Sequence, residues 1–432
     1  MILAAAAVLF AGTAAYLLGG GRVYPGVRLA GADLSNMTPD QASQRIGLLA
    51  AEAGSRRLDL RYAGESTAVS VAELGGTVNV RAAADSAFGY GRRGNLFRRL
   101  AEVIAARRAP VDLPMKYDFD ESAASEFLRA AATNINRDPE NARPVSYDGS
   151  VVIRPEKPGI RLKIEESTAR LVAAINSGRT EVDLAVETSA PKVKSSDLEG
   201  IDGVAGSYST PYNSWERDRS HNLRVACRAL DGTIIKPGGD FSYNQVVGPR
   251  DRKSGFRDAK MFVEGRVESG TGGGVCQVST TVYNAALLAN LKILRRSHHS
   301  RPVVYAPVGR DATVAPNIDL KFRNDTDAPI YISASVGEKT VNVTIFGRRH
   351  DGRKVAIVAE GHSVVSARTV RQVDDGIEPG KSVVAQAGRS GHRITIYRVV
   401  SEGGRVVSRE LVSRDVYAPE TRIIRVSGGA EM

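Results

Sequence analysis

Apolar residues recur at helical or strand spacing through the first part of the chain. In MTPDQASQRIGLLAAEAG they follow a period of three to four behind Thr38, a preferred N-cap, and Pro39, which suits the first helical position. The following LDLRYAGESTAVSVAEL alternates apolar and polar residues, as a pair of strands does. NLFRRLAEVIAARR then places Leu96 and Phe97 on an apolar helical face and its arginines largely off that face. These patterns predict a first α+β module over residues 22–114.

A similar order of elements returns further along the chain. DESAASEFLRAAATNINRDP predicts a helix, the residues around Asp148 a strand pair, KIEESTARLVAAINSG a second helix and TEVDLAVET a closing strand. Both stretches contain a glycine, a strand, a helix and a closing Val-Asp-Leu strand, which indicates two copies of one unit. We expect the second copy over residues 115–195, with a linker after it.

The chain alternates almost throughout from about Lys354 to its end. RITIYRVVSEGGRVVSRELV predicts a hairpin that turns between Ser401 and Gly404. No acid, base or nucleophile clusters in this stretch, so we interpret residues 354–428 as a small β-rich module for adhesion or spacing. Residues 205–348 mix strands and helices in a central α+β domain. The whole chain is therefore expected to be a multidomain α+β protein with an all-β C-terminal module.

The first residues are predicted to hold the chain in a membrane. Residues 2–18, ILAAAAVLFAGTAAYLL, carry no charge and are nearly long enough to cross a hydrocarbon core. A cleaved signal peptide is the alternative, but no basic residue precedes the apolar run. We expect residues 1–21 to be an uncleaved single-pass anchor, with the body of the chain on the outer, cell-wall side of the membrane.

The charge of the chain indicates anionic surroundings. The 432 residues carry a net charge of +11, which favours nucleic acid, anionic lipid headgroups or acidic wall polymers as neighbours. No nucleic-acid motif is found, so we expect no nucleic-acid partner. Arg92, Arg93, Arg98 and Arg99 are candidate contacts to wall polymer or to lipid headgroups. An ordinary solvated helix face is the alternative.

Cys276 stands in a stretch with the parts of a nucleophile site. It follows three glycines in GTGGGVCQVSTTVYNAALLANL, at the start of a helical pattern. The free amides and the positive dipole end of a first helical turn stabilise a thiolate and lower the pKa of such a cysteine. Gly272, Gly273 and Gly274 would let a substrate backbone approach, and the amides from Gly274 to Gln277 would hold an oxyanion.

RRSHHSRPVVY supplies a base shortly after this helix. Only alternate residues of an extended run face the same side, so one of His298 and His299 can point at Cys276 while the other points away. Asp311, in GRDATV, is a candidate for orienting the imidazole. A small, buried core residue is the alternative interpretation of Cys276.

The other cysteine has different surroundings. HNLRVACRAL places Cys227 on an apolar helical face without glycines, so we interpret it as a core residue. A disulfide to Cys276 is the alternative and would block the proposed nucleophile. Adjacent histidines cannot easily share a metal, and no further ligand lies at zinc-site spacing. We expect neither a metal nor another cofactor.

The central stretch resembles the VanW family, named after a vancomycin-resistance accessory protein. PGGDFSYNQVVGPR, GGGVCQVSTTVYNAAL, HSRPVVY, GRDATV and FRNDTDAPIYI occur in the family's order. His299 matches the family's His-Ser pair, whereas Ser297 stands where the family often has a second histidine, and His298 is extra. Residues 22 to about 193 resemble the peptidoglycan-binding-like modules that often precede VanW domains. GHRITIYRVV and DVYAPETRIIRVSG resemble a G-five module.

The resemblance implies a function in the cell wall. Some VanW-domain proteins are regarded as L,D-transpeptidases, which use a cysteine to move an acyl group from a tetrapeptide stem to a neighbouring stem's amine. The implied nucleophile is Cys276 and the implied base is His299. A cysteine peptidase or amidase would use the same residues with water as acceptor, and a non-catalytic wall-binding scaffold would use neither. In each case the expected partner is peptidoglycan or its anionic polymers.

Overall fold

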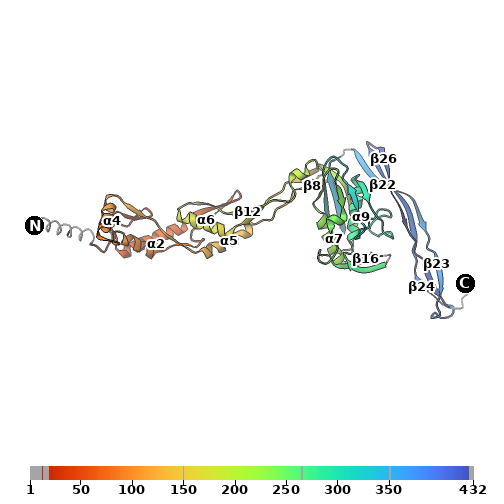
Figure 1. Ribbon diagram of the computed structural model, residues 1–432, viewed down its shortest axis with the longest axis horizontal. Coiled ribbons are helices and arrows are strands. Elements are labelled where there is room, and N and C mark those ends of the chain that lie inside the picture. Colours follow the sequence, from red (N-terminus) through yellow and green to blue (C-terminus); the bar gives the residue numbers. More distant parts are fainter. Residues whose placement is uncertain (1–11, 13–18, 149, 264–265, 350–351, 428–432) are drawn as a thin grey trace. The chain divides into compact units, whose positions relative to one another are not determined.

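A computed structural model describes residues 12, 19–148, 150–263, 266–349 and 352–427. The chain divides into two compact units, residues 1–140 with 158–190 and residues 141–157 with 191–432 (Figure 1). Helices and strands mix in both units and the C-terminal region is all-β, which confirms the predicted α+β class.

The predicted membrane anchor falls largely on residues that the structure does not describe. No helix in the described ranges is both long and apolar enough to cross a membrane. The predicted anchor segment, residues 2–18, lies outside those ranges apart from Gly12.

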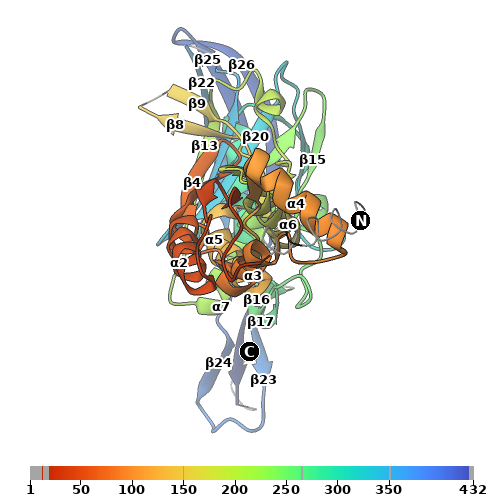
Figure 2. The same cartoon turned by 90° about the vertical axis from the view of Figure 1, so that its left-hand side faces the viewer.

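The first unit contains two hydrophobic cores. The first core gathers Val23, Ile46 and Val103 between three helices and a small sheet (Figure 2). In that sheet β1 pairs in parallel with β6 and antiparallel with β2. The elements are β1 (Val27–Leu29), β2 (Ala32–Asp33), α2 (Pro39–Ser55), α3 (Val80–Gly89), α4 (Leu96–Arg108) and β6 (Val111–Leu113).

The predicted start of α2 is confirmed, whereas the predicted apolar face of α4 is only partly buried. Thr38 and Gln41 form a reciprocal capping box at the start of α2, with Pro39 as the first helical residue. On α4, however, Leu96 is 44% and Phe97 75% exposed, whereas Val103 is fully buried. The helix reaches the core only through its second half, so its predicted apolar face is buried in part.

The second core joins segments that lie far apart in the sequence. β3 pairs antiparallel with β4 and in parallel with β11, and the buried residues run from Leu58 to Leu184. The expected boundary at residue 114 therefore passes through this core. The elements are β3 (Arg57–Tyr62), β4 (Glu65–Ser70), β5 (Gly76–Val78), β7 (Tyr117–Phe119), α5 (Glu121–Ile135), β10 (Gly159–Leu162), α6 (Ile164–Asn176), β11 (Glu181–Asp183) and β12 (Val186–Ser189).

A four-stranded antiparallel sheet forms the centre of the second unit. Its order is β13-β21-β20-β14, and α7 and α9 pack against it and against each other (Figure 1). The elements are β8 (Arg143–Tyr147), β9 (Ser150–Arg154), η1 (Ser195–Leu198), β13 (Gly203–Pro211), α7 (Arg217–Leu230), β14 (Thr233–Ile235), β15 (Asp240–Ser242), α8 (Tyr243–Val247), β16 (Asp258–Val263), β17 (Arg266–Thr271), α9 (Val275–Leu288), β18 (Lys292–Arg295), β19 (Lys321–Arg323), β20 (Ile330–Val336) and β21 (Thr340–Gly347).

The C-terminal strands form two three-stranded sheets, β22-β25-β26 and β23-β27-β24, and the labels of β23 and β24 mark the second sheet in Figure 2. The predicted hairpin is confirmed, because β25 and β26 pair antiparallel on either side of Gly403 and Gly404. Ile357 and Val412 of the first sheet pack against the core of the central domain. The elements are β22 (Arg353–Val365), β23 (Thr369–Val373), β24 (Ser382–Gln386), β25 (Gly391–Glu402), β26 (Arg405–Tyr417) and β27 (Arg422–Val426).

Candidate active site

Cys276 is the second residue of α9, directly behind the glycines. Gly274 is the N-cap and has a left-handed backbone, with φ of 109°. The amide of Val275 donates to Gly272 O at 3.2 Å, and the amide of Gln277 donates to Gly274 O at 2.9 Å. Within the described part of the chain, the amide of Cys276 has no such partner. It is therefore an N–H group of this turn that is available to an oxyanion.

The three glycines are required by the packing of the protein itself. Gly272 and Gly274 have positive φ values, which other residues adopt only with strain. A Cβ on Gly273 would lie 2.6 Å from Ala259 O and 2.7 Å from Lys260 O, on the hairpin of β16 and β17. The space beside Gly273 is thus filled by that hairpin. The sequence had suggested that a substrate backbone would approach there.

Gln277 supports the site from within the core. Its side chain is 1% exposed, its Oε1 accepts from Arg219 Nη2 at 2.8 Å, and its Nε2 donates to Pro211 O at 2.7 Å. Both its backbone N–H and its side-chain amide are therefore engaged, and neither is available for the substrate contact predicted from the sequence. The residue instead ties α9 to α7 and to the end of β13.

The fold brings Cys276, His299 and Asp311 together, and we call these three residues the trio. Cys276 and His299 interact electrostatically, each shifting the pKa of the other, and Cys276 Sγ lies 3.5 Å from Val314 O. His299 Nδ1 lies 2.6 Å from Asp311 Oδ2, and the same oxygen accepts from the amide of His299 at 2.7 Å. Because Nδ1 faces the carboxylate, Nε2 is the ring nitrogen that is left for the thiol.

His298 takes no part in these bonds. Its Nδ1 lies 2.6 Å from the carbonyl oxygen of His299, and its ring packs on the ring of Tyr417 with 4.9 Å between the centroids. The geometry therefore distinguishes the two adjacent histidines and assigns the contact with the thiol to His299.

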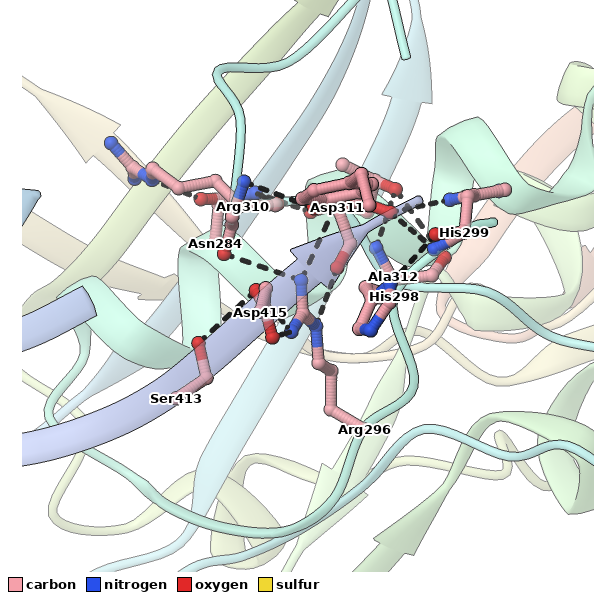
Figure 3. A network of polar contacts seen from close by, with 12 residues as sticks. Asn284, Arg296, His298, His299, Arg310, Asp311, Ala312, Ser413 and Asp415 are labelled. Carbon is pink, nitrogen blue, oxygen red and sulfur yellow. Dashed lines mark hydrogen bonds and ion pairs between the residues drawn. The ribbon is translucent and has the colours of Figure 1, made fainter. Parts of the chain in front are cut away.

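Buried polar side chains of α9 hold the loop that carries Asp311. The amide of Ala312 donates to Thr280 Oγ1 at 3.0 Å. Asn284 Nδ2 donates to Arg310 O at 2.7 Å, and Arg310 Nε donates back to Asn284 Oδ1 at 2.6 Å (Figure 3). The sequence reasoning missed Thr280 and Asn284. The signal was present, because both are polar residues on a helix whose pattern is largely apolar and which carries no charged residue.

The electrostatics of the trio favour an ion pair. Burial would raise the pKa of the Cys276 thiol, but the hydrogen bond and charge of His299, with the charge of Arg250, hold that pKa below its ordinary value. Burial would lower the pKa of His299, but hydrogen bonds to Asp311 and Cys276 raise it to about 9. Burial also opposes ionisation of Asp311, yet the hydrogen bonds from His299 lower its pKa to about 2. Together these shifts favour the thiolate–imidazolium pair beside an ionised Asp311 over a neutral thiol and imidazole.

Arg250 is a second group near the thiol that the sequence reasoning missed. Its guanidinium carbon lies 5.6 Å from the centre of the Tyr243 ring, and its Nη2 donates to Asn244 Oδ1. Its buried Nε has no hydrogen-bond partner among the described residues. Arg250 therefore brings a positive charge and an unused donor to the neighbourhood of Cys276.

Two residues of β26 also reach this region, although the sequence of the C-terminal module shows no cluster of acids, bases or nucleophiles. Tyr417 Oη donates to Asp311 Oδ1 at 2.5 Å, and Asp415 forms an ion pair with Arg296 at 2.7 Å. The module therefore also contacts the candidate site, in addition to the adhesion or spacing predicted from the sequence. Its contacts with Asp311 depend on folding and leave no local mark in the sequence.

Cys227 lies in the hydrophobic core, as predicted. It is 2% exposed, and burial raises the pKa of its thiol to about 12. Neither Cys227 nor Cys276 forms a disulfide. The two thiols therefore differ in ionisation, which makes Cys227 a matched control for experiments on Cys276.

Arg92 has a structural role in the first unit. Its guanidinium carbon lies 4.3 Å from the centre of the Tyr24 ring and 3.9 Å from that of Phe88, and its Nη2 donates to Gly20 O at 2.7 Å. This guanidinium is therefore engaged within the protein, and the wall contact predicted for it from the sequence lacks a free donor face.

The other three arginines lie nearer the surface. Arg93 and Arg98 are exposed, and Arg98 Nε forms an ion pair with Glu102 at 2.9 Å. Arg99 is half-buried, and its Nε lies 3.5 Å from Gly91 O. Of the four candidate residues, Arg93 and Arg98 present the most accessible positive charge.

Three stretches of the chain match known domain families. Residues 218–346 match "VanW like protein", residues 67–183 match "Putative peptidoglycan binding domain", and residues 360–427 match "G5 domain". The first match contains the whole trio, and the last contains Asp415 and Tyr417. The peptidoglycan-binding match crosses residue 114, as the second core of the first unit does.

Two known proteins are similar to parts of this chain. The "Uncharacterized protein YoaR" of Bacillus subtilis (strain 168) is 35% identical over 230 residues, which are 52% of this chain and 75% of that protein. The "Vancomycin B-type resistance protein VanW" of Enterococcus faecalis (strain ATCC 700802 / V583) is 31% identical over 138 residues, which are 31% of this chain and 50% of that protein.

Two solved G5 domains align with the C-terminal region. An IgA1 protease G5 domain is 26% identical and covers 18% of this chain and 95% of its own, with a TM-score of 0.15. HP0197-G5 is 22% identical and covers 17% of this chain and 96% of its own, with a TM-score of 0.13. From the YoaR relationship and the three domain matches, the chain belongs to the VanW family and combines its VanW domain with a peptidoglycan-binding domain and a G5 domain.

Proposed function

We propose that this chain is a cell-wall acyltransferase of the L,D-transpeptidase type. The observation that carries the proposal is the placement of Cys276 in the first turn of α9, where it interacts with His299, whose Nδ1 lies 2.6 Å from Asp311 Oδ2. A nucleophile, a base and a group that orients the base are the parts that covalent acyl transfer requires. The peptidoglycan-binding and G5 domains imply association with the cell wall, where peptide stems supply both acyl donor and acceptor.

In the first half of the reaction, the Cys276 thiolate attacks the carbonyl carbon before the terminal D-alanine of a tetrapeptide stem. A C–S bond forms, and the amide of Cys276 stabilises the oxyanion. His299 then passes its proton to the leaving amine nitrogen as the C–N bond breaks. The products of this half are free D-alanine and a thioester on Cys276.

In the second half, an amine of a neighbouring stem attacks the thioester. The new C–N bond forms, the amine proton passes to His299, and the C–S bond breaks to restore the thiolate. Each half therefore needs His299 in the opposite protonation state. The pKa of about 9 for the resting imidazolium supplies the proton that the first half requires.

Arg250 supports an anionic acyl donor. The D-alanine that leaves carries a carboxylate, and Arg250 places a positive charge and an unpartnered Nε near the thiol. A guanidinium binds a carboxylate through charge-assisted hydrogen bonds. We therefore assign Arg250 to recognition of the donor carboxylate within this proposal.

The location follows from the same proposal. Stem peptides lie outside the cytoplasmic membrane, so the body of the chain from Arg22 onward acts there, with residues 1–21 as its anchor. Protease added to intact, wall-stripped cells should digest the body. Complete protection would contradict this location.

The test uses the full-length chain, purified in detergent, and tetrapeptide-bearing muropeptides, with products identified by mass spectrometry. Cross-linked dimers that have lost a D-alanine are expected, together with an acyl-enzyme adduct on Cys276. Cys276→Ser should keep the fold and lose both products, whereas Cys227→Ser, the matched control, should retain them.

Other product patterns would favour the alternatives. Trimmed monomers without dimers indicate hydrolysis, with water replacing the amine. If Cys276→Ser forms the same products at the same rate as the unmodified chain, the cysteine is not the nucleophile. A chain that binds peptidoglycan and forms no product at all would be a wall-binding scaffold.

A further inference from the structure

The carboxylate of Asp311 faces two different parts of the protein. Its Oδ2 is bonded to the amide and to the ring of His299, as described above. Its Oδ1 faces Tyr417 and Arg296. Asp311 is 1% exposed, so these protein groups decide the orientation of the carboxylate. Tyr417 belongs to β26, within the G5 domain.

The hydroxyl group of Tyr417 is oriented by the protein on both sides. The amide of Gly309 donates to its oxygen at 3.0 Å, and the hydroxyl donates its proton to Asp311 Oδ1 at 2.5 Å. An ionised carboxylate only accepts hydrogen bonds, which fixes this direction. Arg296 Nη2 lies 3.3 Å from the same oxygen, and a bond of that length is weaker. Tyr417 is thus the principal donor to Oδ1.

Asp415 engages the positive charge of Arg296. Arg296 Nη1 lies 2.7 Å from both carboxylate oxygens of Asp415, and Figure 3 shows Arg296 between Asp311 and Asp415. Arg296 and Asp415 are only 6% and 4% exposed. Without Asp415, the full charge of this guanidinium would act on Asp311 and compete with His299 for the carboxylate.

The sheet that carries these residues is packed firmly against the central domain. Asp415 and Tyr417 are two positions apart on a strand and therefore lie on the same face. A Cβ on Gly309 would lie 2.8 Å from the side chain of Ile396, and Arg398 Nη1 donates to Leu291 O at 2.7 Å. The first contact places β25 against the loop that precedes Asp311, and the second holds β25 beside the segment between α9 and β18. The bond from the Gly309 amide to Tyr417 Oη places β26 at the same loop.

We propose that the G5 domain supplies two positioning residues to the active site: Tyr417, which holds Asp311 towards His299, and Asp415, which keeps Arg296 from drawing Asp311 away. The G5 domain is then part of the catalytic unit as well as of the wall-binding apparatus. The expected effect on the reaction rests on the proposed function. The expected effect on the ionisation of Cys276 does not, because that ionisation can be measured without any substrate.

The test follows the alkylation rate of Cys276 by iodoacetamide against pH in the full-length chain. In Tyr417→Phe, Oδ1 keeps only its long contact to Arg296, so the carboxylate turns towards the guanidinium and away from His299. The imidazolium is then less stabilised, and the pH at which the thiolate forms should rise. Asp415→Asn should shift it in the same direction. The groups that face the trio, and are unchanged in Tyr417→Phe, are Arg296, Arg250, Tyr243, Tyr283 and Tyr305.

The matched control is Tyr397→Phe, the same chemical change on the neighbouring strand β25, where the tyrosine ring packs under Arg409. It should leave the alkylation profile unchanged. In transfer assays, Tyr417→Phe should lower kcat on the order of tenfold with little change in KM, because it alters the base and not the binding surface.

An alkylation profile that is unchanged in both Tyr417→Phe and Asp415→Asn would overturn the inference, as would a shift to lower pH. The latter would mean that Tyr417 competes with His299 for Asp311. Each of these outcomes is independent of the product test for Cys276, so either proposal can fail alone. Should Tyr417→Phe fail to fold, Asp415→Asn still decides the question.

Discussion

Replacing Asp311 by asparagine tests the electrostatic account of the site most directly. The change keeps the size of the side chain and removes its negative charge. In the unmodified chain the carboxylate faces the His299 ring at 2.6 Å and favours the imidazolium. The imidazolium in turn favours the Cys276 thiolate. Loss of the charge should therefore lower the pKa of His299 and raise the pKa of Cys276 together.

The magnitude can be estimated in two ways. The rise of the His299 pKa from 6.5 to about 9 corresponds to about 3 kcal/mol, at roughly 1.4 kcal/mol per pKa unit. Opposite charges with centres about 4 Å apart attract by about 4 kcal/mol at an effective dielectric constant of about 20. The first value is the net shift after the cost of burial, so the attractions of Asp311 and of the thiolate together are large enough to outweigh that cost.

The sign of the pH dependence follows from these shifts. The pKa of His299 is raised, so the imidazolium and its favourable contacts are fully present below about 6.5 and are lost as the pH rises through about 9. Transfer by the unmodified chain should decline above about pH 9, because the leaving amine loses its proton donor. In Asp311→Asn, burial without the carboxylate lowers the pKa of His299, and this decline should move to lower pH.

The assay measures the alkylation of Cys276 at pH 7, followed by the rate of transfer. An ordinary thiol is only a few per cent ionised at that pH, so alkylation of Asp311→Asn should slow on the order of tenfold. Transfer should fall by roughly 10³- to 10⁴-fold, as expected when a buried carboxylate no longer orients the base. Asp231→Asn, which removes a charge bonded to Ser333 in the same domain, should change neither rate.

The reasoning would be refuted if Asp311→Asn, shown by circular dichroism to be folded, were alkylated with the same pH profile as the unmodified chain. His299→Gln provides a second route to the same test. It removes the imidazolium itself, so the pKa of Cys276 should rise there too. A reactive thiolate in both variants would mean that α9 and Arg250 alone maintain its ionisation.

Two further predictions concern packing and wall binding. Gly273→Ala places a Cβ 2.6 Å from Ala259 O, so the free energy of unfolding in urea should fall by about 1–3 kcal/mol. The control is Gly47→Ala, where no atom lies within 4 Å of the new Cβ; it should not lower the free energy of unfolding. Binding of the chain to purified wall sacculi should weaken between about 0.1 and 1 M salt, as the Debye length shrinks from about 10 to 3 Å. Arg93→Ala should reduce that binding, whereas Arg92→Met should mainly lower the melting temperature. Binding that depends neither on salt nor on Arg93 would exclude a contact between Arg93 and wall polymer.

Local patterns in the sequence were sufficient for the parts of the protein that depend on neighbouring residues. The capping box of α2, the helix start at Cys276 and the hairpin at Gly403 each follow from contacts within a few positions along the chain. The choice between His298 and His299 came from the family motif. These features are determined by caps, turns and periodicity, which a single sequence displays.

Tertiary structure decided which distant segments meet. β3 pairs with β11 across the predicted module boundary, and no local pattern specifies that partner. Gly273 and Gln277 suggested contacts to a substrate, but the hairpin of β16 and β17 and the side chain of Arg219 occupy those positions. A glycine or an amide has the same appearance in a sequence whether its neighbour is a ligand or the protein itself.

The clearest case is the hydrogen bond of Tyr417 to Asp311, which joins residues 106 positions apart. The sequence by itself determined a cysteine at a helix start, a histidine after that helix and an aspartate in a loop. Only the packing of the G5 domain against that loop decided what holds the aspartate, because the orientation of a buried carboxylate depends on every donor around it, including those from distant strands.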